Sequence, residues 1–142
     1  MGKKRIIQKS ESGTDTGAVK VSVSSKKKLM EGVVHIQSTY NNTLIAITDD
    51  AGNVVTTSSA GSLGFSGAKK GTPYAATKVA EFLGEKAKAM GVKDIKIFMK
   101  GVGAGRESAL RSFAAQGFNI NAIRDITPIP HNGPRPPKPR RV

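Results

Sequence analysis

Three glycines, Gly101, Gly103 and Gly105, alternate in the stretch KGVGAGR, between an apolar alternating segment and a segment of helical spacing. Glycine adopts positive φ and carries no Cβ, so an anion can approach its backbone N–H groups closely. A helix N-terminus favours phosphate as well, through its free N–H groups and partial positive charge. We therefore interpret the stretch as a phosphate contact, and three cations add full charges around it: Lys100, Arg106 and Arg111.

The glycine spacing alone is a weak motif. G-x-G-x-G is not a Walker loop, and it lacks the last glycine of the dinucleotide fingerprint. Glycines in this position also have a purely structural interpretation, since they are needed to turn the corner from strand to helix. If they contact phosphate, a β-branched residue at Gly103 should block the anion more than it disturbs the core.

Two other segments combine cations with an accessible backbone. Residues 60–71, AGSLGFSGAKKG, form a predicted glycine- and serine-rich loop that ends in Lys69 and Lys70, and we interpret the lysine pair as a phosphate contact. Phe65 in this loop either anchors it to the core or stacks on a base, and the core role is favoured. The end of the chain, PIPHNGPRPPKPRRV, is proline-rich and basic without an acidic residue, which suits an extended segment lying along a polyanion. A proline-rich peptide ligand is the alternative.

The charge of the whole chain indicates a polyanionic partner. With 142 residues, a net charge of +13 and a pI near 10.3, the chain is one domain's worth of a strongly basic protein, and nucleic acid is the expected ligand. No apolar run approaches the length of a membrane-spanning helix. A transit peptide fits residues 1–29 poorly, because Glu11 and Asp15 are acidic and arginine occurs only once.

The residues of catalysis and metal binding are sparse. The chain has no cysteine and two histidines, so His35 is expected to be a structural or surface histidine, and no metal site or cofactor is predicted. Asp49, Asp50, Glu81 and Asp125 show no spacing that demands a shared metal ion. An alternative hypothesis, a nucleotide-dependent enzyme, rests on the glycine stretch and on Asp125, placed like a ribose-binding acid. It leaves no candidate general base.

Hydrophobic patterning predicts the elements that position these residues. Residues 32–39, 43–48 and 54–59 are β-branched strands joined by short turns, which indicates an antiparallel meander. Thr72 and Pro73 begin a helix that ends at Gly91. Its apolar stripe is predicted to be core: Ala75, Ala76, Val79, Phe82, Leu83, Ala87 and Met90. The strand before the glycine stretch, the helix after it and a last strand at 119–127 complete the order βββ-α-β-α-β.

This order predicts an α/β fold, with a mixed five-strand sheet and two helices packed on it. The arrangement resembles the ribonuclease-H-like fold, but the first strand lacks the acidic metal ligand of a nuclease. We divide the chain into a disordered basic arm at residues 1–30 with net charge +6, an RNA-binding core at 31–127, and an extended tail at 128–142.

Four ordered motifs carry a more specific resemblance: YNNTLIAITD, TPYAA, KGVGAGRESALR and DITPIPHNGPRPPKPRRV. Over residues 30–142 the chain resembles the bacterial form of ribosomal protein eleven of the small subunit. The resemblance implies a non-enzymatic protein of cytoplasmic ribosomes. Such a protein lies on the subunit platform, bridges helices of ribosomal RNA and helps form the messenger cleft near the Shine–Dalgarno pairing. Its implied neighbours are ribosomal proteins seven and eighteen of the same subunit.

The resemblance also implies which residues contact RNA. They are Asn41, Asn42, Lys69, Lys70, Lys100, Arg106, Arg111, Arg135, Lys138, Arg140 and Arg141, and the residue-level argument adds Gly101, Gly103 and Gly105. Two positions depart from the family pattern. Ser66 stands where many members have a basic residue, which weakens one loop contact, and Pro134 stands where many have cysteine.

Overall fold

The structure, a computed structural model, describes residues 29–141. Its elements follow the order β1 (Glu31–Ser38), β2 (Thr43–Thr48), β3 (Val54–Ser59), η1 (Gly61–Leu63), η2 (Gly67–Gly71), α1 (Pro73–Ala89), β4 (Asp94–Lys100), α2 (Gly105–Ala115) and β5 (Asn119–Asp125). The predicted order βββ-α-β-α-β is confirmed. The predicted basic arm lies almost entirely outside the described residues.

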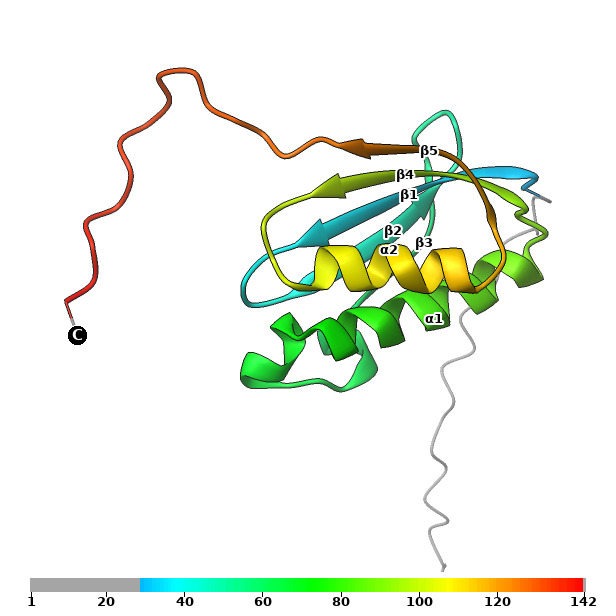
Figure 1. Cartoon of the computed structure of the whole chain (residues 1–142), viewed down its shortest axis with the longest axis horizontal. Coiled ribbons are helices and arrows are strands. Elements are labelled where there is room, and N and C mark those ends of the chain that lie inside the picture. Colours follow the sequence, from blue (N-terminus) through cyan, green and yellow to red (C-terminus); the bar gives the residue numbers. More distant parts are fainter. Residues whose placement is uncertain (1–28, 142) are drawn as a thin grey trace, which may run out of the picture.

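The five strands form one mixed sheet in the order β3-β2-β1-β4-β5. β1 pairs antiparallel with β2, and β2 with β3, whereas β4 runs parallel to β1 and β5 parallel to β4. Figure 1 shows both helices on one face of this sheet, and the chain after β5 leaving the domain in an extended form. The predicted mixed sheet with two helices is therefore confirmed.

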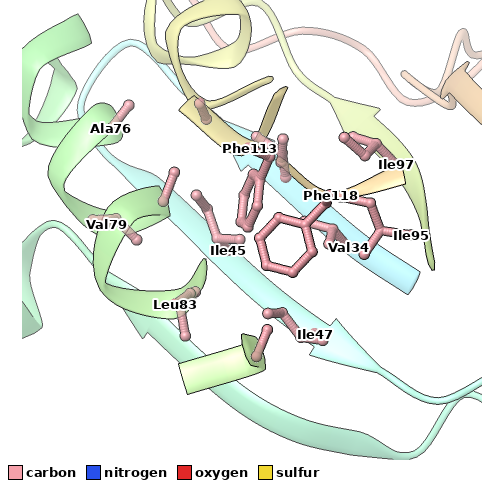
Figure 2. Packing of buried hydrophobic residues seen from close by; sticks show 14 of the residues in the cluster. Val34, Ile45, Ile47, Ala76, Val79, Leu83, Ile95, Ile97, Phe113 and Phe118 are labelled. Carbon is pink, nitrogen blue, oxygen red and sulfur yellow. The ribbon is translucent and has the colours of Figure 1, made fainter. Parts of the chain in front are cut away.

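The core lies between the sheet and the helices. Figure 2 shows Val34, Ile45, Ile47, Ile95 and Ile97 from the strands facing Ala76, Val79 and Leu83 of α1 and Phe113 of α2, all of them buried. Alternation along each strand places every second side chain on this face, as the period of two predicted. This packing holds both helices against the sheet, and it thereby positions the N-terminus of each helix in space.

Three boundaries and one segment differ from the sequence predictions. β1 is shifted by one residue at each end, from 32–39 to Glu31–Ser38, and β5 ends at Asp125 instead of residue 127. The predicted loop at residues 60–71 contains the 3-10 helices η1 and η2. Within residues 29–141, no helix is long and apolar enough to cross a membrane.

Candidate nucleic-acid interface

Three loops gather at one end of the molecule. β1, β3, β4 and β5 run in the same direction, so their carboxyl ends share one edge of the sheet with the N-termini of α1 and α2. We call residues 39–42, 60–72 and 100–104 the loop edge. Figure 1 shows its cyan turn, green short helices and yellow loop together at the end from which the tail departs.

Glycines pack the loop edge together. A Cβ added at Gly101 would overlap the carbonyl oxygen of Ser38, and one at Gly103 would overlap that of Thr39. At Gly71 an added Cβ would overlap the carbonyl oxygen of Tyr40 from the other side. The turn at residues 39–42 is therefore clamped between η2 and the 101–104 loop, and only glycine allows an approach this close.

The backbone N–H groups of two of the three glycines have acceptors within the protein. The Gly103 N–H donates to the Ser38 carbonyl (3.1 Å), and the Gly101 N–H donates to Thr127 Oγ1 (3.2 Å). Neither N–H is free to hold an anion, because each already has an internal acceptor. The structural interpretation of these two glycines, a corner packed against the end of β1, explains the observed geometry.

Arg106 is bound within the protein. Its Nη1 donates to the Gly101 carbonyl (2.7 Å) and its Nη2 pairs with Asp125 Oδ2 (2.6 Å). Asp125 Oδ1 accepts from the N–H (3.0 Å) and hydroxyl (2.6 Å) of Thr127. Hydrogen bonds from Arg106 and then Thr127 lower the pKa of the Asp125 carboxyl strongly. This network ties the 101–104 loop to the end of β5, where the tail begins.

Arg111 does not reach the loop edge. It lies six residues into α2, about 9 Å along the helix axis from Gly105, and pairs with Glu107 one turn earlier. Both side chains are largely exposed. The structure thus separates Arg111 from the other predicted contacts.

The remaining predicted contacts outside the tail lie at the loop edge. Lys69 and Lys70 occupy the last turn of η2 and Lys100 ends β4, and none of the three forms an ion pair within residues 29–141. In the turn, Asn41 is exposed, while the Asn42 N–H donates to Thr39 Oγ1 (3.1 Å).

The tail presents its cations fully to solvent. Residues 128–141 contain no helix or strand, and every one of them is exposed. The tail cations, Arg135, Lys138, Arg140 and Arg141, form no ion pair with a described residue. The tail therefore leaves the loop edge as an extended basic segment (Figure 1).

Sequence reasoning missed the residues that assemble the loop edge. Ser38 and Thr43 are fully buried, with their hydroxyl oxygens 3.4 Å apart, and the 101–105 glycines pack against them and Thr39. The role of Gly71 was also missed. Thr72 and Pro73 are sufficient to begin α1, so the presence of a glycine just before them was a signal that this position has a different role. Phe65 packs against the core and lies edge-on to Tyr74, which confirms its predicted core role.

Metal-binding geometry is not found in the described part of the chain. No group of three histidine, aspartate or glutamate side chains within residues 29–141 is placed to hold a metal ion. His35 lies on the sheet face opposite the helices, where its Nε2 hydrogen-bonds Thr48 Oγ1 (3.2 Å) and its ring lies edge-on to Phe98. Burial lowers the pKa of His35. It is a structural histidine, as predicted.

Comparison with known families accounts for this arrangement of a small core with a basic edge and tail. The family model for Ribosomal protein S11 matches residues 32–141, which include the whole loop edge and the described tail. Proteins of this family are structural, non-enzymatic components of the small ribosomal subunit, where ribosomal RNA and other ribosomal proteins are their partners. The chain belongs to the ribosomal protein S11 family.

Proposed function

We propose that the chain binds small-subunit ribosomal RNA through the loop edge and the tail, and that it does so on the platform of a bacterial-type cytoplasmic ribosome. There it bridges separate RNA helices and helps form the messenger cleft near the Shine–Dalgarno pairing. Ribosomal proteins seven and eighteen are its proposed neighbours. These finer assignments rest on the sequence motifs together with the position of the basic residues.

One observation carries the proposal: three lysines that form no ion pair within residues 29–141 lie together at the loop edge. Lys69, Lys70 and Lys100 come from two loops far apart in sequence and lie on the edge from which the tail departs. Asp125 and Glu107, which belong to β5 and to the first turn of α2, are each paired with an arginine. Such a surface attracts phosphate from a distance and gains further affinity when counterions are released on binding.

The two features that suggested a nucleotide-dependent enzyme, the glycine stretch and Asp125, have internal hydrogen-bond partners in the structure. The Gly101 and Gly103 N–H groups have internal acceptors, and both carboxylate oxygens of Asp125 are hydrogen-bonded to Arg106 or Thr127. The glycine stretch and Asp125 therefore have a shared structural role, which is to join the 101–104 loop to β5. No specific observation favours nucleotide binding at this place.

The proposal is tested by removing two unpaired loop-edge lysines and comparing the variant with a matched control. The test variant carries Lys69→Gln and Lys100→Gln. The control carries Lys78→Gln and Lys96→Gln, which remove the same charge from lysines already paired with Glu81 and with Glu31 and Asp50. If both loop-edge lysines touch phosphate, the log–log salt slope of binding to small-subunit RNA should flatten by roughly 1.4 to 1.8 units.

The control should flatten the slope much less, because its lysines are already neutralised. Equal changes in the two variants would show that only total charge matters, and would contradict binding at the loop edge.

A second experiment tests the proposed protein neighbours. The chain is assembled into small subunits and cross-linked at its exposed lysines. Cross-links to ribosomal proteins seven and eighteen support the platform position, and cross-links only to distant proteins refute it.

A further inference from the structure

Tyr40 is an aromatic residue with no partner in the described chain. It lies at the tip of the turn between β1 and β2, and it is 79% exposed. Within residues 29–141 its ring contacts no other ring and no cation, and its hydroxyl makes no hydrogen bond. The chain's other tyrosine, Tyr74, has ring contacts with Phe65 (6.0 Å between centroids) and with Lys78 Nζ (5.7 Å).

The backbone that carries Tyr40 is held firmly. The Thr39 N–H donates to the Asn42 carbonyl (2.9 Å), and the Asn42 N–H donates back to Thr39 Oγ1 (3.1 Å). Gly71 packs against the Tyr40 carbonyl, and Gly103 packs against the Thr39 carbonyl. The ring therefore projects from a backbone that is already ordered, so the turn loses little backbone freedom when a ligand covers the ring.

The segments that pack against the turn contain lysines and an exposed apolar side chain. Lys70 directly precedes Gly71, which packs against the Tyr40 carbonyl, and Lys100 precedes the 101–104 loop, which packs against Ser38 and Thr39. Neither lysine forms an ion pair within residues 29–141. Val102, at the tip of the loop that packs against Thr39, is 60% exposed. An apolar surface flanked by free cations matches a nucleotide, which has a flat apolar base and an anionic phosphate.

We propose that Tyr40 stacks on an unpaired nucleobase of small-subunit ribosomal RNA, with Lys70 and Lys100 meeting the phosphates on either side. This inference rests on the proposed function and adds the kind of RNA that the turn recognises. Bases inside an RNA helix are stacked on each other and inaccessible to a side chain, whereas loops and bulges offer bases that stack on aromatic rings. The turn thus selects a single-stranded feature, while the tail needs only phosphates.

The first test compares three variants for binding to a small-subunit RNA fragment. Tyr40→Ala should weaken binding by roughly 5- to 150-fold, the usual effect of losing one stacked base. Tyr40→Phe should bind within about twofold of wild type, because stacking uses the ring and not the hydroxyl. Tyr74→Phe is the matched control. The salt slope and the melting temperature of Tyr40→Ala should equal those of wild type, since no charge and no packed side chain is removed.

The second test observes the ring directly. The chain has two tyrosines and no tryptophan, so in Tyr74→Phe all tyrosine fluorescence comes from Tyr40. Single-stranded RNA of mixed sequence should quench this fluorescence by stacking. Inorganic polyphosphate, which has the charge but no bases, should bind without quenching. Equal quenching by both would mean that the ring responds to charge alone and would overturn the proposal.

The outcomes separate this inference from the proposed function. If wild type fails to bind small-subunit RNA, the proposed function fails and the inference fails with it. If wild type binds but Tyr40→Ala binds equally well, only the inference fails. Full RNA affinity of Tyr40→Ala combined with poor incorporation into small subunits would assign the ring to a protein neighbour and would likewise overturn it.

Discussion

Gly103 has no room for a side chain, because an added Cβ would overlap the carbonyl oxygen of Thr39 at the end of β1. We therefore expect Gly103→Ala to lower the free energy of unfolding by about 1–3 kcal/mol, the usual cost of overpacking a fitted contact. This reverses the expectation from sequence, in which a substitution here harmed anion binding more than folding. Urea unfolding of the variant, with RNA affinity measured per folded molecule, tests whether stability is lost more than RNA affinity.

Gly61→Ala is the matched control for Gly103→Ala. A Cβ at Gly61 would lie 3.6 Å from Lys70 Cδ, which is an ordinary contact with a flexible side chain. Its stability should stay within about 0.5 kcal/mol of wild type. If the two variants are equally stable, the clamp around the 39–42 turn does not constrain Gly103.

Asp125 should make the stability of the domain sensitive to acid. Its folded-state pKa is lowered by hydrogen bonds from Arg106 and Thr127, so its contribution is complete above the unfolded pKa of about 3.9. The contribution is lost as the pH falls towards the folded pKa. Between about pH 5 and pH 3, wild type should therefore lose more stability than Asp125→Asn, which has no carboxylate to protonate.

Urea unfolding at several pH values measures this difference. Glu85→Gln is the control, because it removes an exposed carboxylate that forms no ion pair within the described residues. A wild-type acid profile in Asp125→Asn would show that the Arg106 network adds no stability through this carboxylate.

At the scale of elements, Thr72 joins η2 to α1. Its Oγ1 accepts from the Ala75 N–H (3.3 Å) and donates to the Lys69 carbonyl (2.7 Å). Thr72→Ala should lower the free energy of unfolding by about 1 kcal/mol, as for other helix N-caps, and Thr72→Ser should restore most of it. Thermal unfolding followed by circular dichroism measures both. A neutral Thr72→Ala would mean that Pro73 alone fixes the start of α1.

The elements could be predicted because their patterns are local. Apolar alternation predicted the strands. The Thr72–Pro73 start together with the apolar stripe predicted α1, and the stripe residues Ala75, Ala76, Val79, Leu83 and Ala87 are buried as predicted. Phe82 was placed in the core wrongly. It is 38% exposed and carries Lys86 Nζ 4.2 Å from its ring centroid. A position at the margin of an apolar stripe can face either side, and only the packed neighbours decide which.

The loop edge was predictable in its charges but not in its packing. Lys69, Lys70 and Lys100 stand out in the sequence because cations flank glycines there. The contacts of Gly71 and Gly103 with the 39–42 turn join segments that are about 30 and 60 residues apart, so no local pattern encodes them. The internal use of Arg106 was missed for the same reason, since its partner Asp125 belongs to another strand.

At the scale of the whole molecule, the proposed function divides RNA binding between the loop edge and the tail. The loop edge is held by internal contacts and contains three lysines without an ion pair in the described chain, while residues 128–141 are exposed throughout. Truncation after Asn132 removes the four tail cations. It should flatten the log–log salt slope of RNA binding by roughly two to three units, if most but not all of them touch phosphate.

Folding should be unaffected by this truncation, because the deleted segment contributes no buried side chain to the core. A full-length variant with Arg135, Lys138, Arg140 and Arg141 all changed to Gln separates charge from backbone. If the tail acts through phosphates, this variant and the truncation should show the same slope and the same melting temperature. If the neutral tail keeps wild-type affinity while the truncation loses it, the tail contacts the RNA through its backbone and prolines and not through its charges. A slope unchanged in both variants would leave the lysines of the loop edge as the main source of the salt dependence, and the tail would then have no part in holding RNA.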